Sequence, residues 1–285
     1  MIQDISPYRL ENTFQRINPA AENYFFSFSE QNVLLLSRKD GQLCLPTFRD
    51  LQQTLSDIED LVVYLFSVDN TPLYLIKSQD LVTLNNGCLN YYPIHILAGL
   101  QPAWAYFAAV TALHLSRWYG QNTYCGKCGN VMEHSPVQRA LICNNCGNIV
   151  YPQIAPVVIV AVVNDDKLLL TKYSDRTLPQ WVLISGFVEI GETIEDAARR
   201  EVYEETGIKI KDLQYFGSQP WGLSGSVIMG YIAKLDGSDK IHLDCSELAE
   251  ALWHPRSELP RELANTSITY ELIEALRTNK KGDGK

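Results

Sequence analysis

Short apolar runs separated by polar turns characterise the first hundred residues. The polar segment 38–41 (Arg-Lys-Asp-Gly) is typical of a turn, and the runs around it have strand length. The next stretch, 103–118, has few helix breakers and is too short to span a bilayer, which favours a buried helix. The pattern predicts a β-rich N-terminal domain over residues 1–100 and a connecting helix within 101–123. The predicted strands are 24–28, 33–37, 61–66 and 73–76.

Strands and helices alternate after residue 150. The apolar runs 157–163 and 167–171 flank Asn164-Asp165-Asp166, which predicts a hairpin. Residues 193–205 are expected to form a helix that ends at Gly207. This segment is therefore expected to contain both strands and helices. Its other expected elements are a loop at 186–191, strands at 213–216 and 226–233, and a closing helix at 268–276.

The chain has 285 residues, enough for two domains, and a formal net charge of -9. We assign 153–278 to the α/β domain and expect 279–285 to be a disordered tail. The acidic excess argues against a protein that mainly coats nucleic acid, because phosphate contacts need Lys and Arg. It permits a nucleotide substrate, since bound metal ions supply positive charge locally. The N-terminus lacks a basic start and an apolar core, so we expect no secretory signal, no membrane partner and a cytoplasmic location.

Four of the seven cysteines form two Cys-x-x-Cys pairs, and a glycine follows each pair. Zn2+ prefers four soft ligands in a tetrahedron, and each pair offers two thiolates from one tight turn. With cysteine at all four positions, none is left for a reacting water, which predicts a structural zinc ribbon over 124–152. Unrelated reduced thiols and a redox pair are the alternatives, although a redox pair needs only one such turn. The expected zinc ligands are Cys125, Cys128, Cys143 and Cys146.

The segment 186–208 carries a regular arrangement of carboxylates. On a helix, Glu201 and Glu205 are one turn apart and Glu204 lies beside them, so their charges repel each other. Hard divalent cations such as Mg2+ and Mn2+ would offset that repulsion and also bind phosphate oxygens. A solvated acidic helix face is the ordinary alternative. The preceding glycine loop and Glu192, at fixed offsets from the helix, favour the metal site.

The spacing of this segment resembles the signature of the Nudix hydrolases, Gly-x5-Glu-x7-Arg-Glu-apolar-x-Glu-Glu-x-Gly-apolar, and matches every specified position. The resemblance implies an α/β/α sandwich with a mixed sheet. It also implies metal-dependent hydrolysis of a nucleoside diphosphate that is linked to another moiety. The signature leaves open which glutamate acts as the base. The expected catalytic residues are Glu201, Glu204, Glu205, Arg200, which would orient the carboxylates by pairing, and Glu192, which would support them.

A β-rich region, a four-cysteine ribbon and a Nudix domain, in that order, resemble the NAD(H) diphosphatases. The segments 151–156 (Tyr-Pro-Gln-Ile-Ala-Pro) and 185–192 (Ser-Gly-Phe-Val-Glu-Ile-Gly-Glu) are very similar to theirs, and the resemblance covers residues 100–275 well. It implies cleavage of NAD(H) to nicotinamide mononucleotide and AMP, and the same cut at a 5′ NAD cap on RNA. It further implies catalytic Mg2+ or Mn2+, one structural Zn2+ per chain and a homodimer.

These enzymes carry a second signature, Gln-Pro-Trp-Pro-Phe-Pro-x-Ser, and this chain departs from its centre. Residues 222–224 are Gly-Leu-Ser, so one aromatic is lost and two glycines are expected to loosen the loop. The preference for NADH therefore stays open. The resemblance implies metal ligation by Glu250 and by the backbone carbonyl of Ser185, with a plain surface glutamate as the alternative at position 250. We expect Trp181 and Trp253 to be core residues rather than base-stacking platforms. The implied substrate-binding residues are Tyr151, Gln219, Pro220, Trp221, Gly222, Leu223, Ser224, Gly225, Ser226 and Thr269.

Two other interpretations remain open at this stage. One keeps the same chemistry and changes the substrate to ADP-ribose, a dinucleoside polyphosphate or FAD. The other is non-catalytic: a zinc-ribbon protein that senses a nucleotide or binds nucleic acid. The intact set of glutamates argues against the second interpretation, because a protein that only binds a nucleotide does not need it.

Overall fold

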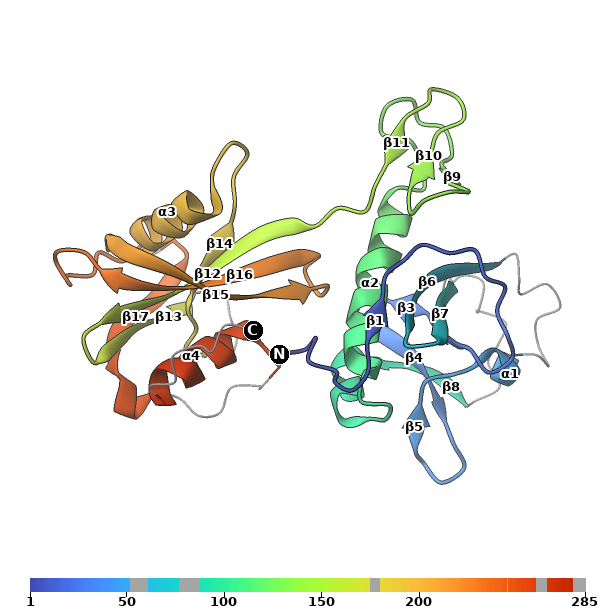
Figure 1. The fold of residues 1–285 in the computed structure, drawn as a ribbon, viewed down its shortest axis with the longest axis horizontal. Coiled ribbons are helices and arrows are strands. Elements are labelled where there is room, and N and C mark those ends of the chain that lie inside the picture. Colours follow the sequence, from blue (N-terminus) through green and yellow to red (C-terminus); the bar gives the residue numbers. More distant parts are fainter. Residues whose placement is uncertain (52–60, 77–87, 175–179, 245, 260–265, 279–285) are drawn as a thin grey trace. The chain divides into compact units, whose positions relative to one another are not determined.

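The computed structural model describes residues 1–51, 61–76, 88–174, 180–244, 246–259 and 266–278 (Figure 1). They form two compact units. The N-terminal unit consists of Asp4–Gln153 together with Gly222–Gly225. The C-terminal unit consists of Met1–Gln3, Ile154–Trp221 and the chain from Ser226 onward. The tail 279–285, which we expected to be disordered, lies outside the described residues.

The N-terminal unit is β-rich, as the sequence predicts. One sheet has the strand order β1-β6-β7-β2, and in the other β4 pairs with β3, β5 and β8. Helix α2 confirms the helix expected at 103–118 and is slightly longer. The elements are β1 (Leu10–Glu11), β2 (Tyr24–Phe26), β3 (Phe28–Ser29), β4 (Asn32–Ser37), β5 (Leu43–Cys44), α1 (Phe48–Leu51), β6 (Val62–Val68), β7 (Thr71–Ile76), β8 (Leu89–Pro93), η3 (Ile94–Gly99) and α2 (Ala105–Gln121).

Aromatic side chains form much of the core of this unit. Phe25, Phe48 and Tyr74 are almost fully buried. The Phe48 ring lies 5.5 Å from the Phe25 ring and 5.4 Å from the Tyr74 ring, measured between centroids. Such rings bury a large apolar area each, which explains why short strands suffice to hold the unit together. A small ribbon sheet, in the order β11-β10-β9, follows α2 and consists of β9 (Glu133–His134), β10 (Leu141–Ile142) and β11 (Ile149–Val150).

The C-terminal unit is built on a mixed sheet with the strand order β15-β16-β12-β13-β17, and β14 also pairs with β12. Strands β12 and β16 run parallel, whereas the other pairs are antiparallel. The elements are β12 (Ala155–Asn164), β13 (Lys167–Tyr173), β14 (Ile184–Phe187), α3 (Ile194–Thr206), β15 (Ile210–Trp221), β16 (Ser226–Leu235), β17 (Leu248–Pro255), η4 (Arg256–Glu258) and α4 (Ile268–Thr278).

Helices cover both faces of this sheet, with α3 on one side and α4 on the other (Figure 1). Successive residues of β12 point to opposite faces, so Val158 and Val160 pack in the α3 layer while Ile159 and Ala161 pack in the α4 layer. A strand that is buried on both faces needs apolar residues at every position, which explains the unbroken run 157–163. The predicted α/β/α sandwich with a mixed sheet is confirmed.

The hairpin between β12 and β13 is confirmed too, with Asn164 paired to Lys167 across a turn in which Asp165 has φ 50°. Three strands of this sheet differ from the prediction. The start of the expected loop 186–191 belongs to β14, β15 extends well beyond the expected 213–216 at both ends, and β17 was not predicted at all. In the N-terminal unit, β1, β5 and β8 were not predicted either. Strands β14 and β17 join the sheet through partners far away in the sequence, which a local pattern does not report. Among the described residues, no helix is long and apolar enough to cross a bilayer.

Candidate functional site

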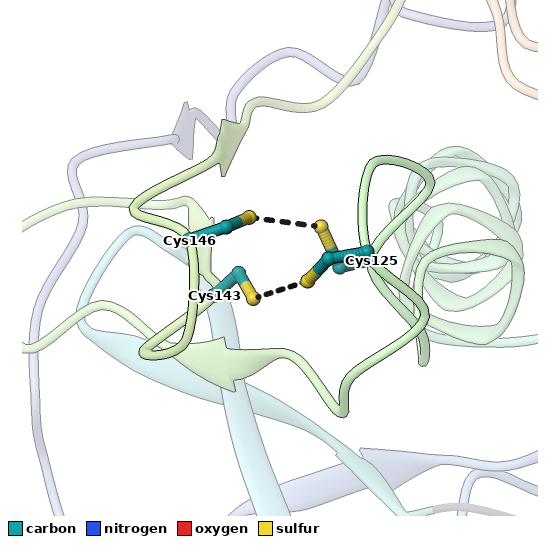
Figure 2. A group of neighbouring side chains, drawn as sticks. Cys125, Cys143 and Cys146 are labelled. Carbon is teal, nitrogen blue, oxygen red and sulfur yellow. Dashed lines mark hydrogen bonds between the residues drawn. The ribbon is translucent and has the colours of Figure 1, made fainter.

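The two Cys-x-x-Cys pairs form matching turns that face each other, with Cys143 and Cys146 on one turn and Cys125 on the other (Figure 2). The glycine after each pair has a positive φ, 74° at Gly129 and 70° at Gly147. The N–H of each glycine donates to the carbonyl of the first cysteine, at 2.8 Å and 2.9 Å respectively. Glycine adopts this backbone conformation at no steric cost, and so it lets both turns close around one point.

The sulfur atoms have the separations that a zinc ion needs. The Sγ atoms of Cys125 and Cys146 lie 3.6 Å apart, those of Cys128 and Cys143 lie 3.4 Å apart, and all four fall within 4.8 Å of one another. Zn–S bonds of about 2.3 Å in a tetrahedron place sulfurs about 3.8 Å apart. Several hydrogen bonds, the largest from the backbone N–H of Asn130, lower the pKa of Cys128 to about 5, which favours the thiolate form that binds zinc. The four cysteines therefore fit a zinc ion.

Helix α3 carries three of the four predicted catalytic carboxylates, with Glu192 just before it, and has a defined start and end. The side chain of Thr193 accepts a hydrogen bond of 3.1 Å from the N–H of Asp196, which caps the first turn. Gly207 ends the helix with φ 68°, and its N–H donates to the carbonyl of Tyr203 at 2.7 Å. The buried Val202 fixes the helix against the sheet. The carboxylates thus project from a rigid element.

The guanidinium of Arg200 holds three of these carboxylates. Its Nε and Nη2 donate to the two oxygens of Glu192 at 2.8 Å and 3.0 Å. Its Nη1 donates to Glu201 at 2.7 Å and to Glu204 at 3.0 Å. Its Nη2 also donates to the carbonyl of Phe187 at 2.9 Å, which ties the helix to the end of β14. The bonds from Arg200 lower the pKa of Glu192 and keep Glu201 and Glu204 in fixed positions.

Glu205 has a different environment, because its side chain is turned into the protein. The residue is 4% exposed, and its Oε2 has no hydrogen-bond partner. Burial, together with the negative charges of Glu201 and Glu247, raises the pKa of Glu205 to about 8. A buried carboxylate with an unpaired oxygen is costly, whereas a divalent cation beside it would offset that cost. Of all the observations at this site, this one points most directly to a metal.

The glycine of the signature, Gly186, lies directly against the Glu201 carboxylate. A Cβ atom at position 186 would overlap with that carboxylate. The Glu201 side chain is 13% exposed, and its burial raises its pKa. Any larger residue at position 186 would therefore push the carboxylate out of place.

Replacing Gly186 by Ala is expected to weaken Mn2+ binding by about 10- to 100-fold, because the new methyl group displaces the Glu201 carboxylate. The fold should survive, since the group that has to move is the end of a flexible side chain. Mn2+ titration followed by electron paramagnetic resonance, together with thermal melting, checks both points. Gly217→Ala is the matched control, because nothing lies within 4 Å of a Cβ atom there. An unchanged Mn2+ affinity in Gly186→Ala would contradict a metal site at Glu201.

Two carboxylates that sequence reasoning missed act on the same pair. The charge of Glu247 raises the pKa of both Glu201 and Glu205, and the charge of Asp244 raises that of Glu205. The N–H of Asp244 donates to the carbonyl of Glu205 at 3.0 Å, which fixes this segment beside the end of α3. Both residues lie outside the signature. The signal that could have revealed them is their recurrence at three-residue intervals with Glu250.

Glu250, the ligand expected outside the signature, lies on β17 opposite Lys172 of β13. Its carboxylate accepts a hydrogen bond of 2.8 Å from Lys172 Nζ, which also lies 4.1 Å from the centroid of the Trp181 ring. In the part of the chain that the structure describes, only the four cysteines bring three or more possible ligand atoms within 4.8 Å of one another. Glu250 is therefore held in an ion pair that metal binding would have to break.

Ser185, whose carbonyl was expected to contact the metal, directly precedes Gly186 on β14. The hydroxyl of Tyr173 donates to this carbonyl at 3.3 Å and lies 3.2 Å from the Ser185 Oγ. Tyr173 thus connects β13 to β14, the strand that places Gly186 against the Glu201 carboxylate. A metal at this carbonyl would share it with the tyrosine, because a carbonyl oxygen has two lone pairs.

Gln219, the first residue of the predicted substrate-binding segment, holds two elements of the C-terminal unit together. Gln219 is fully buried. Its Nε2 donates to the carbonyl of Thr266 at 2.7 Å, and its Oε1 accepts from the N–H of Ile268 at 2.8 Å. The side-chain amide therefore joins β15 to the start of α4. Trp221 is half-buried, Pro220 is exposed, Ser226 is 3% exposed, and Thr269 is half-buried in α4.

The central residues of the segment, Gly222–Gly225, belong to the N-terminal unit and are held firmly there. A Cβ atom at Gly222 would overlap with the backbone carbonyl of Val110 in α2. Arg117 donates to the carbonyl of Leu223. The expectation that two glycines loosen the loop is therefore wrong, because Gly222 instead permits close contact with a helix. Ser224 is exposed, and Gly225 has φ 72°.

Tyr151 also belongs to the N-terminal unit, directly after the ribbon. Its side chain is 53% exposed, and its hydroxyl accepts a hydrogen bond of 3.1 Å from Gln138 Nε2. Trp181 and Trp253 are partly buried and pack against the core on opposite faces of the C-terminal sheet, as expected.

Comparisons with known proteins agree with this geometry. Residues 153–276 match the family model of the NUDIX domain, and residues 121–151 match that of the NADH pyrophosphatase zinc ribbon domain. Proteins named NAD-capped RNA hydrolase NudC are similar to this chain over 162 residues: those of Photorhabdus laumondii and Shigella flexneri are 41% identical and that of Escherichia coli strain HS is 40% identical. Each match covers 57% of this chain and 63% of the relative.

The two matched segments contain the carboxylate site and the four-cysteine site. The NUDIX match contains α3 with its carboxylates and Arg200, and the ribbon match contains all four cysteines. The relatives are matched over less than two thirds of their own length, so their names describe those proteins. This chain has a NUDIX domain preceded by an NADH pyrophosphatase zinc ribbon domain.

Proposed function

We propose that this protein hydrolyses the diphosphate bond of NAD(H) in the presence of Mg2+ or Mn2+, and that it releases nicotinamide mononucleotide and AMP. The observation that carries this proposal is the buried Glu205, whose unpaired carboxylate oxygen lies beside the charge of Glu201. Such a pair is stabilised by a cation, and a cation held there can bind a diphosphate. The names of the relatives support the dinucleotide as substrate.

The proposed metal ligands come from β14, α3 and β17. The Ser185 carbonyl, Glu201, Glu205 and Glu250 are the metal ligands that we propose. Bound Mg2+ or Mn2+ would supply positive charge to the diphosphate and lower the pKa of an attacking water. Arg200 keeps the carboxylates of Glu201 and Glu204 in place through its hydrogen bonds.

Glu192 and Glu204 complete the proposed catalytic set. Glu192 accepts two hydrogen bonds from Arg200 and so fixes the position of the guanidinium. Glu204 is exposed and paired with the same group, which leaves it free to meet water or substrate. The substrate would contact Thr269, Tyr151 and the segment from Gln219 to Ser226, and Trp221 offers an aromatic face for a base.

We further propose a homodimer that also acts on RNA with a 5′ NAD cap. The relatives are named for that substrate, and a cap presents the same diphosphate as free NAD. A reducing compartment such as the cytoplasm suits the four zinc-binding thiolates.

Product analysis in oxygen-18 water tests this function. NADH with Mn2+ or Mg2+ should give equimolar mononucleotide and AMP, with one label on the phosphate that was attacked. ADP-ribose, diadenosine polyphosphates and FAD form the comparison panel, because Leu223 replaces an aromatic residue of the related signature. Faster cleavage of a panel member than of NADH would replace the proposed substrate, and no cleavage of any would overturn the hydrolase.

Replacing Lys172 by Met is expected to tighten Mn2+ binding by up to about fivefold, because Glu250 no longer has to leave an ion pair of modest strength. Mn2+ titration by electron paramagnetic resonance measures the change. Lys234→Met, which breaks the exposed pair with Asp212 on the same sheet, is the matched control. If both variants bind Mn2+ as the unmodified protein does, Glu250 is not a metal ligand.

A further inference from the structure

The N-terminal unit contains a cavity of about 710 Å³ that the proposed hydrolysis does not use. Its walls come from the segment 14–19, strand β6 and the ribbon residues 134–140, all within this unit. The volume lies within the range typical of small-molecule sites. The cavity is therefore large enough to hold a ligand of mononucleotide size.

The two charged side chains in the described part of the lining, both arginines, are basic. Arg16, Arg139 and His134 line the cavity, and its described lining contains no Asp or Glu. This is notable in a chain with a formal net charge of -9. Guanidinium groups bind phosphate and carboxylate through paired N–H donors, so the lining favours an anion.

Two polar atoms in the lining have no hydrogen-bond partner among the residues that the structure describes. Arg139 donates from Nη2 to the carbonyl of Asn12 at 3.3 Å, but its Nη1 is buried and unpaired. Tyr64 is 7% exposed, and its hydroxyl is buried and unpaired as well. Buried polar atoms are nearly always paired in folded proteins. Both atoms line the same cavity, so a single ligand could satisfy both.

Aromatic rings also line the cavity. The ring of Tyr119, which is 6% exposed, lies 4.9 Å from the His134 ring, and the Tyr64 ring lies 5.8 Å from the Tyr74 ring, measured between centroids. Burial raises the pKa of Tyr119 and the nearby Arg139 partly opposes that rise, so the Tyr119 hydroxyl and the Arg139 guanidinium lie in one region of the cavity. Such rings accept a planar base on a face or an edge.

From this combination we propose that the cavity binds a nucleoside monophosphate unit, with its phosphate at Arg139 and Arg16 and its base beside Tyr64 and Tyr119. Paired cationic donors and aromatic rings are the two features that a nucleotide needs, and here they line one space. The unit can be free AMP or one nucleotide of an RNA chain. The proposal does not depend on the hydrolysis proposed for the C-terminal unit.

Photolabelling of the full, zinc-loaded protein with 8-azido-AMP, followed by peptide mapping, tests the proposal. Labelled peptides from 61–64 or 134–140 are expected, and labels beyond residue 153 report on the NUDIX domain separately. Competition then identifies the source: protection by AMP alone supports a free nucleotide, and protection by a short uncapped RNA supports a nucleotide of RNA. Absence of label in the cavity peptides, or equal protection by inorganic phosphate, would overturn the assignment.

Three single substitutions test which side chains hold the nucleotide. Arg139→Ala should weaken labelling of the cavity peptides by about tenfold, the loss expected when a charged donor pair is removed. Arg38→Ala removes the same charge from an exposed position outside the cavity and should change nothing. Tyr64→Phe should also reduce labelling, and it cannot unfold the protein through a lost bond because its hydroxyl has no protein partner. Equal labelling in all three variants would mean that only water fills the cavity.

Discussion

Replacing Glu205 by Gln is expected to lower the turnover of NADH by about 10²- to 10⁴-fold, while nucleotide binding stays measurable. The amide keeps the size of the side chain and removes the charge that we propose holds the metal. The steady-state rate with Mn2+ and the affinity for a nucleotide measure the two effects separately. Glu195→Gln is the matched control, since it changes an exposed glutamate in the first turn of the same helix.

The same variant is expected to stabilise the metal-free protein at alkaline pH. The pKa of Glu205 is raised to about 8, so its folded form keeps a proton that the unfolded chain has already lost. Between about pH 4.5 and pH 8, this one group lowers the free energy of unfolding by at most about 1.4 kcal/mol per pH unit. The contribution of protonated Glu205 to the free energy of unfolding is fully present below the pKa of the unfolded chain, about 4.5, and it is lost as the pH rises through the folded pKa of about 8. Gln has no proton to lose and removes this slope.

Thermal melting of the zinc-loaded protein in buffer without Mg2+ or Mn2+, at pH 6 and pH 8.5, checks the slope. Added Mn2+ should raise the melting temperature more at pH 8.5 than at pH 6. A protein that only senses nucleotides gives a different result, with no turnover before or after the change. Full turnover in Glu205→Gln would exclude Glu205 as a metal ligand. An unchanged pH slope would show that its burial does not control stability.

Replacing Cys143 by Ser is expected to reduce bound zinc from one ion per chain to nearly none and to unfold the ribbon. Binding of structural Zn2+ contributes about 10 kcal/mol or more to the folding of small zinc domains, and the ribbon strands β9 to β11 have only two residues each. Metal analysis measures the zinc, and hydrogen exchange of 124–151 measures the folding. Exchange in α3 should stay slow, because that helix packs in the core of the C-terminal unit.

Cys44→Ser provides the control, since Cys44 is a free cysteine outside the ribbon whose sulfur contacts Arg38. That variant should keep its zinc and its exchange pattern. If Cys143→Ser retains a full equivalent of zinc, the ribbon sulfurs are not the zinc ligands, whatever their spacing.

The sequence by itself determined those features that depend on neighbours along the chain. The two cysteine turns, helix α3 with its threonine cap and its final glycine, and the hairpin at Asp165 all follow from residues a few positions apart. Gly186 and Glu201 are both fixed positions of the signature. Only the structure showed that the glycine makes room for the carboxylate itself.

Tertiary structure decided the electrostatics of the site. The burial of Glu205, the charge of Glu247 beside it and the pairing of Glu250 with Lys172 arise where strands and loops from distant parts of the chain meet. It also fixed Gln219 in the packing and Gly222 against α2. The physical reason is that desolvation and Coulomb interactions depend on distance in space, which a linear pattern does not contain. Turn conformation and the hydrogen bonds of helix ends depend mainly on residues that are close together along the chain, and the linear pattern does contain that information.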